Sequence, residues 1–208
     1  MSLLFNQIHL KKNNYQRGVS LIVVLLILVI VSILGVSGVQ ISMMAEKSSR
    51  NDRDYQIAWQ ASEAALVDAE FDIEGLPAGA TNKRNSIFKL GQTDISKFIT
   101  GCGASSPSTG LCSLNETGKP AWLAVDFTNS GNNANTIAFG TFTGRTFPAG
   151  GAGIQPSKPP RYVIEAIPDP ENSRTTKPTD IKYIYRVTAM GFGPNPETQT
   201  VVQMLYRN

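Results

Sequence analysis

Residues 17–34 read RGVSLIVVLLILVIVSIL, and this apolar run decides how the rest of the chain is organised. No residue from 19 to 45 is charged. As a helix, the segment Val19–Val39 would span about 31 Å, close to the thickness of the hydrocarbon core of a bilayer. An ordinary secretory signal is shorter and closes with a small-residue cleavage site, which is absent here. The run therefore predicts a single membrane-spanning helix.

Charged residues flank the run asymmetrically. Lys11, Lys12 and Arg17 precede it with no acidic residue among them, and Glu46 is the first charge that follows. The positive-inside rule then places residues 1–17 in the cytoplasm and the chain after about residue 45 outside, in the periplasm. These three cations account for the net charge of +3. The remainder is neutral, so its charge predicts no nucleic-acid partner.

The helix is expected to continue through Glu46–Gly75, which is rich in alanine, glutamate and glutamine and has no proline. Apolar side chains recur in it at steps of three and four, which predicts one face packed on a soluble domain. We expect Tyr55 and Trp59 to be core residues of that face rather than a binding site. The face comprises Tyr55, Trp59, Ser62, Leu66, Ala69 and Ile73, widened by Ala58 and Ala65.

The end of this helix is marked by Gly75 and Pro77, a favourable left-handed cap followed by a residue that cannot continue the helix. Four carboxylates stand just before it at two-residue spacing, which distributes them around the helix. That spacing predicts a solvated surface rather than a catalytic pair or a calcium site. The four are Asp68, Glu70, Asp72 and Glu74.

Beyond the helix, the composition predicts a sheet with long loops. Residues 76–120 are rich in Gly, Ser, Thr, Asn and Pro and predict irregular structure, with one short helix at 93–98. Strands are expected where β-branched and aromatic residues alternate, and the sequence GFGPNP supplies a turn that makes the last two strands antiparallel neighbours. The expected strands are 122–127, 136–142, 161–167, 181–191 and 198–207.

The expected fold class is α+β. In the strand 181–191, one face carries Ile181, Tyr183, Tyr185, Val187 and Ala189. The apolar stripe of the helix needs a partner, and one face of the sheet is the only large one available. We therefore expect one long N-terminal helix, with a membrane half and an amphipathic half, packed on an antiparallel sheet of three to five strands.

Two cysteines, Cys102 and Cys112, enclose the loop GASSPSTGL. The charge argument places this loop in an oxidising compartment, where paired cysteines usually form a disulfide. Closing so short a loop would stabilise the fold by roughly 2–3 kcal/mol. A metal site needs further ligands, and no histidine lies nearby.

Nothing in the chain predicts an active site. The single histidine, His9, lies in the first 18 residues, which removes histidine-based acid–base and metal chemistry from the rest. The glycine-containing stretch GTFTGRT at 140–146 lacks both the spacing and the lysine of a phosphate-binding loop. We expect no enzymatic activity, no cofactor and no metal.

Several stretches together resemble type IV pilins, and within them the PilX type of minor pilin. QRGVSLIVVLLILVIVSILGVS resembles the class III leader and N-terminal helix of pilins, and RNDRDYQIAWQASEAALVDAE resembles the PilX type. The sequences GLC at 110–112 followed by AWLAV, RYVIE at 161–165 and the closing YRVTAMGFGPNPETQTVVQMLYR resemble the same group. The resemblance implies the pilin fold, with one long helix against an antiparallel sheet.

The resemblance also implies processing at the N-terminus. A prepilin peptidase would cleave between Gly18 and Val19 on the cytoplasmic side and the new amino group of Val19 would be methylated. Major pilins usually carry glutamate at the fifth mature position, where this chain has Val23. That carboxylate is thought to meet the amino terminus of a neighbouring subunit. Its absence implies a subunit at or near the filament tip.

The organisation expected from the resemblance has four parts: a cleaved leader (1–18), the transmembrane and filament-core half of the helix (19–45), its amphipathic half (46–75) and a periplasmic globular domain (76–208). The expected function is a non-catalytic minor pilin that primes assembly and supports twitching motility and adhesion. It starts in the inner membrane as a single-pass protein and ends in the pilus at the cell surface. Expected partners are other minor pilins, the major pilin, a large tip adhesin, the inner-membrane assembly platform and the prepilin peptidase.

Two alternatives remain open at this point. A type II secretion pseudopilin would share the same helix and the same tip argument, and a secretion defect without a motility defect would identify it. An uncleaved membrane anchor that presents a periplasmic binding domain would retain residues 1–18.

Overall fold

The computed structural model describes residues 19–151, 153–171 and 181–207. The chain forms two compact units, one ending at Ser49 and the other beginning at Arg50. Of the predicted features, His9 and Gly18 lie outside the described residues. The elements are α1 (Val19–Glu74), the 3-10 helices η1 (Asn85–Phe88) and η2 (Ile95–Lys97), β1 (Leu111–Ser113), α2 (Ala121–Ala124), β2 (Ile137–Ala138), β3 (Arg161–Pro168), β4 (Tyr183–Phe192) and β5 (Gln199–Tyr206).

The helix α1 ends where its sequence predicts. Gly75 has a φ of 75°, and the N–H of Leu76 donates to the carbonyl of Phe71 at 2.8 Å, which satisfies a carbonyl of the last turn. In the described part of the chain, α1 is the one helix long and apolar enough to cross a membrane, and no residue of its apolar window is buried.

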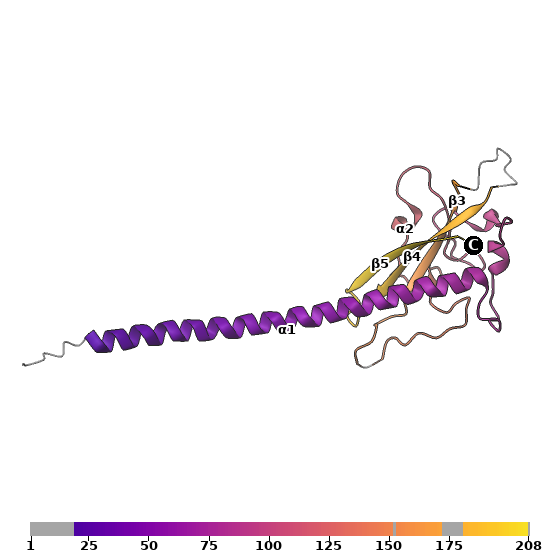
Figure 1. Cartoon of the computed structure of the whole chain (residues 1–208). Coiled ribbons are helices and arrows are strands. Elements are labelled where there is room, and N and C mark those ends of the chain that lie inside the picture. The colour runs from indigo at the N-terminus through magenta and orange to yellow at the C-terminus, as the bar shows by residue number, and fades with distance from the viewer. Residues whose placement is uncertain (1–18, 152, 172–180, 208) are drawn as a thin grey trace, which may run out of the picture. The chain divides into compact units, whose positions relative to one another are not determined.

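The buried face of α1 consists of small residues, so the sheet approaches the helix closely. A Cβ on Gly191 of β4 would lie 2.1 Å from the carbonyl oxygen of Ala58, so only glycine fits there. The C-terminal part of α1 lies against one face of the sheet (Figure 1). Its buried residues are Ala58, Ala61, Ser62, Ala65, Asp68, Ala69, Asp72 and Ile73.

The sheet has the order β1-β3-β4-β5, with β2 also paired to β3. β3, β4 and β5 are successive antiparallel neighbours, with Val187 opposite both Ile164 and Met204. β1 runs parallel to β3, so the sheet is mixed and the expectation of a purely antiparallel sheet is wrong at this strand. A parallel pair needs a long crossover connection, and residues 114–160 between β1 and β3 supply one.

The core lies between α1 and the sheet. Tyr185, Val187 and Ala189 of β4 are buried in it and Tyr183 packs against it, so the predicted face is confirmed for these four residues. The fifth, Ile181, precedes the strand. A smaller cluster lies around Val163 of β3 and contains the residues Cys102, Cys112, Ala121 and Phe127. This cluster covers part of the sheet face that does not meet α1.

Three local predictions differ from the structure. The expected strand 122–127 is wrong, because α2 forms there: Pro120 starts a single turn that buries Ala121. An alternating run this short fits a helical turn as well as a strand. The expected strand 136–142 shrinks to the two residues of β2 because Thr141 N–H turns back to the carbonyl of Ala138. The helix expected at 93–98 is only the 3-10 turn η2.

Candidate functional site

The best-defined polar cluster of the globular unit centres on Arg84, which is 3% exposed. Its Nε donates to Asp72 Oδ1 at 3.0 Å and its Nη2 to Asp72 Oδ2 at 2.6 Å, a bidentate ion pair with both side chains buried. The hydroxyl of Tyr162 on β3 donates to the same carboxylate at 3.1 Å. Burial, and then the charge of Asp72, raise the pKa of the Tyr162 phenol, so the hydroxyl stays a donor.

Arg84 also holds the disulfide loop. Its Nη1 donates to the carbonyls of Pro107 at 2.8 Å and Thr109 at 2.7 Å, both inside the loop that Cys102 and Cys112 close. The guanidinium carbon lies 3.7 Å from the centre of the Phe142 ring, a cation–π contact. One side chain therefore joins α1, the disulfide loop and the segment after β2.

A second buried carboxylate, Asp68, is held by the loop that follows β2. Gly140 N–H donates to it at 2.8 Å and the Thr143 hydroxyl at 2.6 Å, and Arg145 Nη1 lies 3.5 Å away. Burial raises the pKa of Asp68 despite these donors. The stretch GTFTGRT thus binds an anion, but the anion is a side chain of this protein.

The prediction that Asp68 and Asp72 form solvated surface is wrong, since they are 0% and 2% exposed. Glu74 is exposed and Glu70 is half-buried. The buried pair lies four residues apart, in line with Ala61 and Ala65. A stripe of alanines leading into two aspartates was the available signal, and apolar periodicity alone misses it because the period is carried by small and charged side chains.

The predicted disulfide is present. Cys102 and Cys112 are bonded, with an S–S distance of 2.01 Å, and both side chains are buried. The segment that precedes Cys102 lies beside β1. Ile99 N–H donates to the carbonyl of Leu111, and Ser113 N–H donates to the carbonyl of Ile99, both at 3.1 Å.

The four residues predicted to pack α1 on the sheet have different positions. Ile73 is 1% exposed, and Leu66 is partly buried against the same core. Tyr55 is 51% and Trp59 is 42% exposed, so the prediction that both are core residues is wrong. The aromatic residues lie at the margin of the stripe because the alanine face lets the helix lie closer to the sheet than large side chains allow.

The apolar half of α1 is uniformly exposed, including Val19 at 59% and Val23 at 50%. The hydroxyls of Ser32 and Ser37 donate to the carbonyls of Leu28 and Ile33 one turn earlier. These bonds satisfy both of these hydroxyls within the helix, as a lipid environment requires.

The buried polar network ties α1, the disulfide loop and the segment after β2 into one frame. The buried carboxylates Asp68 and Asp72 are fully occupied by partners of this chain. Among the described residues, no group of three or more His, Cys, Asp or Glu side chains is placed to hold a metal ion.

Two family models match the chain. The model described as PilX N-terminal covers residues 17–67, and the model described as type IV pilus assembly protein PilX C-term covers residues 108–208. The first includes the apolar half of α1, and the second includes all five strands and part of the disulfide loop. No curated protein and no solved structure matches the chain.

Proposed function

The chain belongs to the PilX-type minor pilins of type IV pili, and from that premise we propose that it acts at or near the pilus tip. In this proposal it joins other minor pilins and a large tip adhesin in a priming complex on the inner-membrane assembly platform. Major pilin subunits then add beneath this complex. The chain thereby supports initiation of assembly, twitching motility and surface adhesion, and it carries no chemistry of its own.

The observation that carries the tip position is the missing carboxylate at Val23. A carboxylate in lipid is costly and is kept only where a partner meets it. In a repeating subunit that partner would be the amino terminus of the subunit above. A subunit with none above it needs no carboxylate, and this helix has no charge from residue 19 to 45.

The proposed route begins in the inner membrane. Residues 19–45 span it once, the globular unit lies in the periplasm, and the prepilin peptidase cleaves between Gly18 and Val19. The amino group of Val19 is then methylated. The apolar helix remains part of the mature chain after cleavage. On assembly it leaves lipid for contacts with neighbouring pilin helices, at a modest free-energy cost because it is apolar on all sides.

Intact mass of the chain from membranes and from sheared pili, with and without reduction, tests this route. We expect loss of residues 1–18, one added methyl group, and two hydrogens fewer before reduction than after it. Trace amounts in sheared pili support a tip position. A full-length chain confined to the membrane would instead indicate an anchored binding domain, and a defect in secretion without one in motility would indicate a pseudopilin.

A Val23→Glu substitution tests the tip argument itself. We expect the variant to fold normally but to spread along the filament, giving more copies per sheared pilus. Val24→Glu is the matched control, because it places the same charge one residue out of register. Equal copy numbers in the two variants and the unchanged chain would contradict the tip argument.

A further inference from the structure

β5 is the open edge of the sheet. Among the described residues it pairs with β4 alone, and nothing in Gln199–Tyr206 protects the edge: the strand has no charge, proline or glycine. Exposed edge strands normally carry such residues because unpaired backbone groups recruit other chains. An unprotected edge of this length indicates a strand that is covered in use.

The hydrogen-bond register identifies the backbone groups that this edge presents. Gly193 N–H donates to the carbonyl of Thr198 at 2.7 Å, so these residues form a hydrogen-bonded pair. Bonded pairs alternate along an antiparallel ladder, so even-numbered residues of β5 bond β4. Val201, Gln203 and Leu205 therefore direct their N–H and C=O groups away from β4, toward the free edge.

The same three residues also carry the exposed side chains of the strand. Leu205 is 67% and Val201 is 42% exposed, and Gln203 is exposed between them. They lie on the sheet face that α1 does not cover. The smaller hydrophobic cluster, which contains the disulfide, covers that face at Val163 of β3 but contains no residue of β5.

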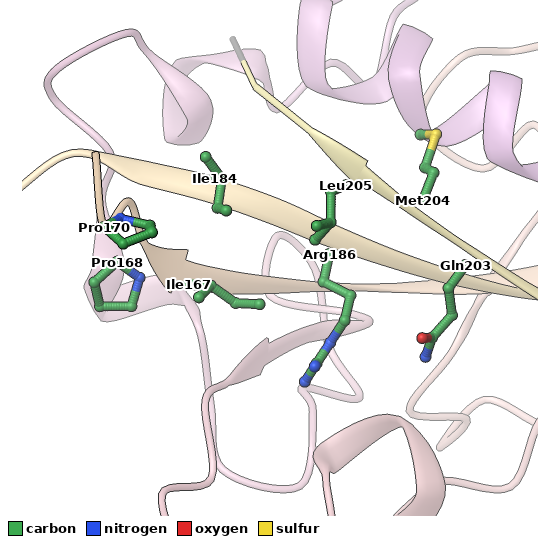
Figure 2. Close-up of a pocket in the computed structure, with 8 residues that line it drawn as sticks. All are labelled: Ile167, Pro168, Pro170, Ile184, Arg186, Gln203, Met204 and Leu205. Carbon is green, nitrogen blue, oxygen red and sulfur yellow. The ribbon is translucent and has the colours of Figure 1, made fainter. Parts of the chain in front are cut away.

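Beside Leu205 this face forms a groove of about 550 Å³. Figure 2 shows Gln203 and Arg186 pointing to the same side of the sheet, while Met204 points to the other. Arg186 is held in place by Glu165, to which its Nε donates at 2.8 Å. The lining is Ile167, Pro168, Pro170, Ile184, Arg186, Gln203, Met204 and Leu205.

We propose that β5 accepts an extended segment of another pilus subunit as an added strand, with one of its apolar side chains seated in this groove. The outward backbone groups of Val201, Gln203 and Leu205 bind the segment, and the groove selects apolar residues at alternate positions in it. The proposal rests on the proposed function, which supplies the partner.

Photo-crosslinking in cells that assemble pili tests the proposal, with p-benzoyl-phenylalanine in place of Leu205 in the full chain. We expect a cross-link to an extended stretch of a different pilus subunit, mapped by mass spectrometry. The matched control is the same group at Leu123, which is 54% exposed on α2, and it should give no such product because α2 contacts β1 at the other end of the sheet. A product with a second copy of this chain, or with lipid alone, would overturn the proposal.

Backbone specificity is tested with Gln203→Pro, which removes an outward N–H without removing a bond to β4. Gln203→Thr is its control, because both lose the side-chain bond to Thr188 but threonine keeps the N–H. We expect the proline variant to lower the cross-link yield about tenfold and the threonine variant to leave it near that of the unchanged chain. Equal yields would overturn strand addition.

A second pair of variants covers the case in which proline disturbs folding. With the cross-linking group at Val201, Leu205→Lys should lower the yield at least as much as Gln203→Pro does, and Leu123→Lys, at the other end of the sheet, should not. If the chain is needed for piliation but Leu205 yields no cross-link, the docking proposal alone fails. If piliation is independent of the chain, the proposed function fails first.

Discussion

The two ends of this sheet are built in opposite ways. Beyond β1, Ile99 makes two backbone bonds with the strand, and the Cys102–Cys112 bond fixes the loop beside it. Beyond β5 no described residue pairs with the strand, and Val201 and Leu205 stand exposed. Each of these strands, β1 and β5, has backbone N–H and C=O groups on its outer side that no other strand of the sheet pairs with. The comparison indicates that the chain closes one edge covalently for stability and leaves the other free for association.

Arg84→Met should have the largest effect, because it breaks the anchor of the closed edge. Removing one partner of a buried ion pair leaves Asp72 charged and unpaired, and we expect about 3–5 kcal/mol lower free energy of unfolding. Denaturant unfolding of the full chain in detergent micelles measures it. Arg53→Met is the control, because the exposed pair Arg53–Asp54 contributes about 0–1 kcal/mol. Equal losses in the two variants would contradict the anchoring role of Arg84.

Removing the disulfide should have the next largest effect. The double variant Cys102→Ala/Cys112→Ala should lose about 2–3 kcal/mol. Hydrogen exchange of the Ile99 and Ser113 amides should become faster, because the loop then leaves β1 more often. The β5 amides bonded to β4 should change only as much as global stability does. Unchanged exchange at Ile99 would show that the edge is closed without the disulfide.

Asp68 gives a smaller effect that depends on pH. Burial raises its pKa above 3.8, the value it has in an unfolded chain. Its contribution to stability is therefore full below pH 3.8 and is lost as pH rises through the higher pKa of the folded state. We expect the free energy of unfolding of the unchanged chain, relative to Asp68→Asn, to fall across that window. A difference that is constant or rises with pH would contradict a raised pKa.

Leu205→Lys should have the smallest effect on stability, within about 0.5 kcal/mol, because an exposed side chain on an open edge packs on little. The same substitution at the closed edge, Leu111→Lys, should lower the Tm far more than Leu205→Lys does, since Leu111 is fully buried. Thermal unfolding of both variants makes the comparison. A large loss for Leu205→Lys would show that the β5 face is covered within this chain.

Elements long enough to repeat their residue pattern several times were predictable from the sequence. Residue spacing predicts the helix that ends at Gly75, the pair of strands around the GFGPNP turn and the inward face of β4. The disulfide is predicted from the oxidising compartment and from the presence of two cysteines in the loop. Short elements were not, because WLAVDF satisfies a helical turn and a strand equally. The parallel placement of β1 was not predictable either, since three residues carry no signal of direction.

The sequence did not predict the buried polar cluster around Arg84. Tyr162 is 90 residues from Asp72 and Arg84 lies beyond the end of the helix that carries Asp72, and each is of a type that usually lies at the surface or the margin of a core. Only the fold brings them together. Their ion pair and hydrogen bonds then offset part of the cost of burying each one, a cost that would be high for any of the three alone.

The way Arg84 holds the disulfide loop has a consequence for sequence variation. It binds the loop through the backbone carbonyls of Pro107 and Thr109 and through no side chain of the loop. The side chains from Ala104 to Ser106 are exposed. Substitutions of these exposed loop residues can therefore accumulate without disturbing the contacts that Arg84 makes with the loop backbone. Homologous chains should show their greatest divergence there, between two invariant cysteines.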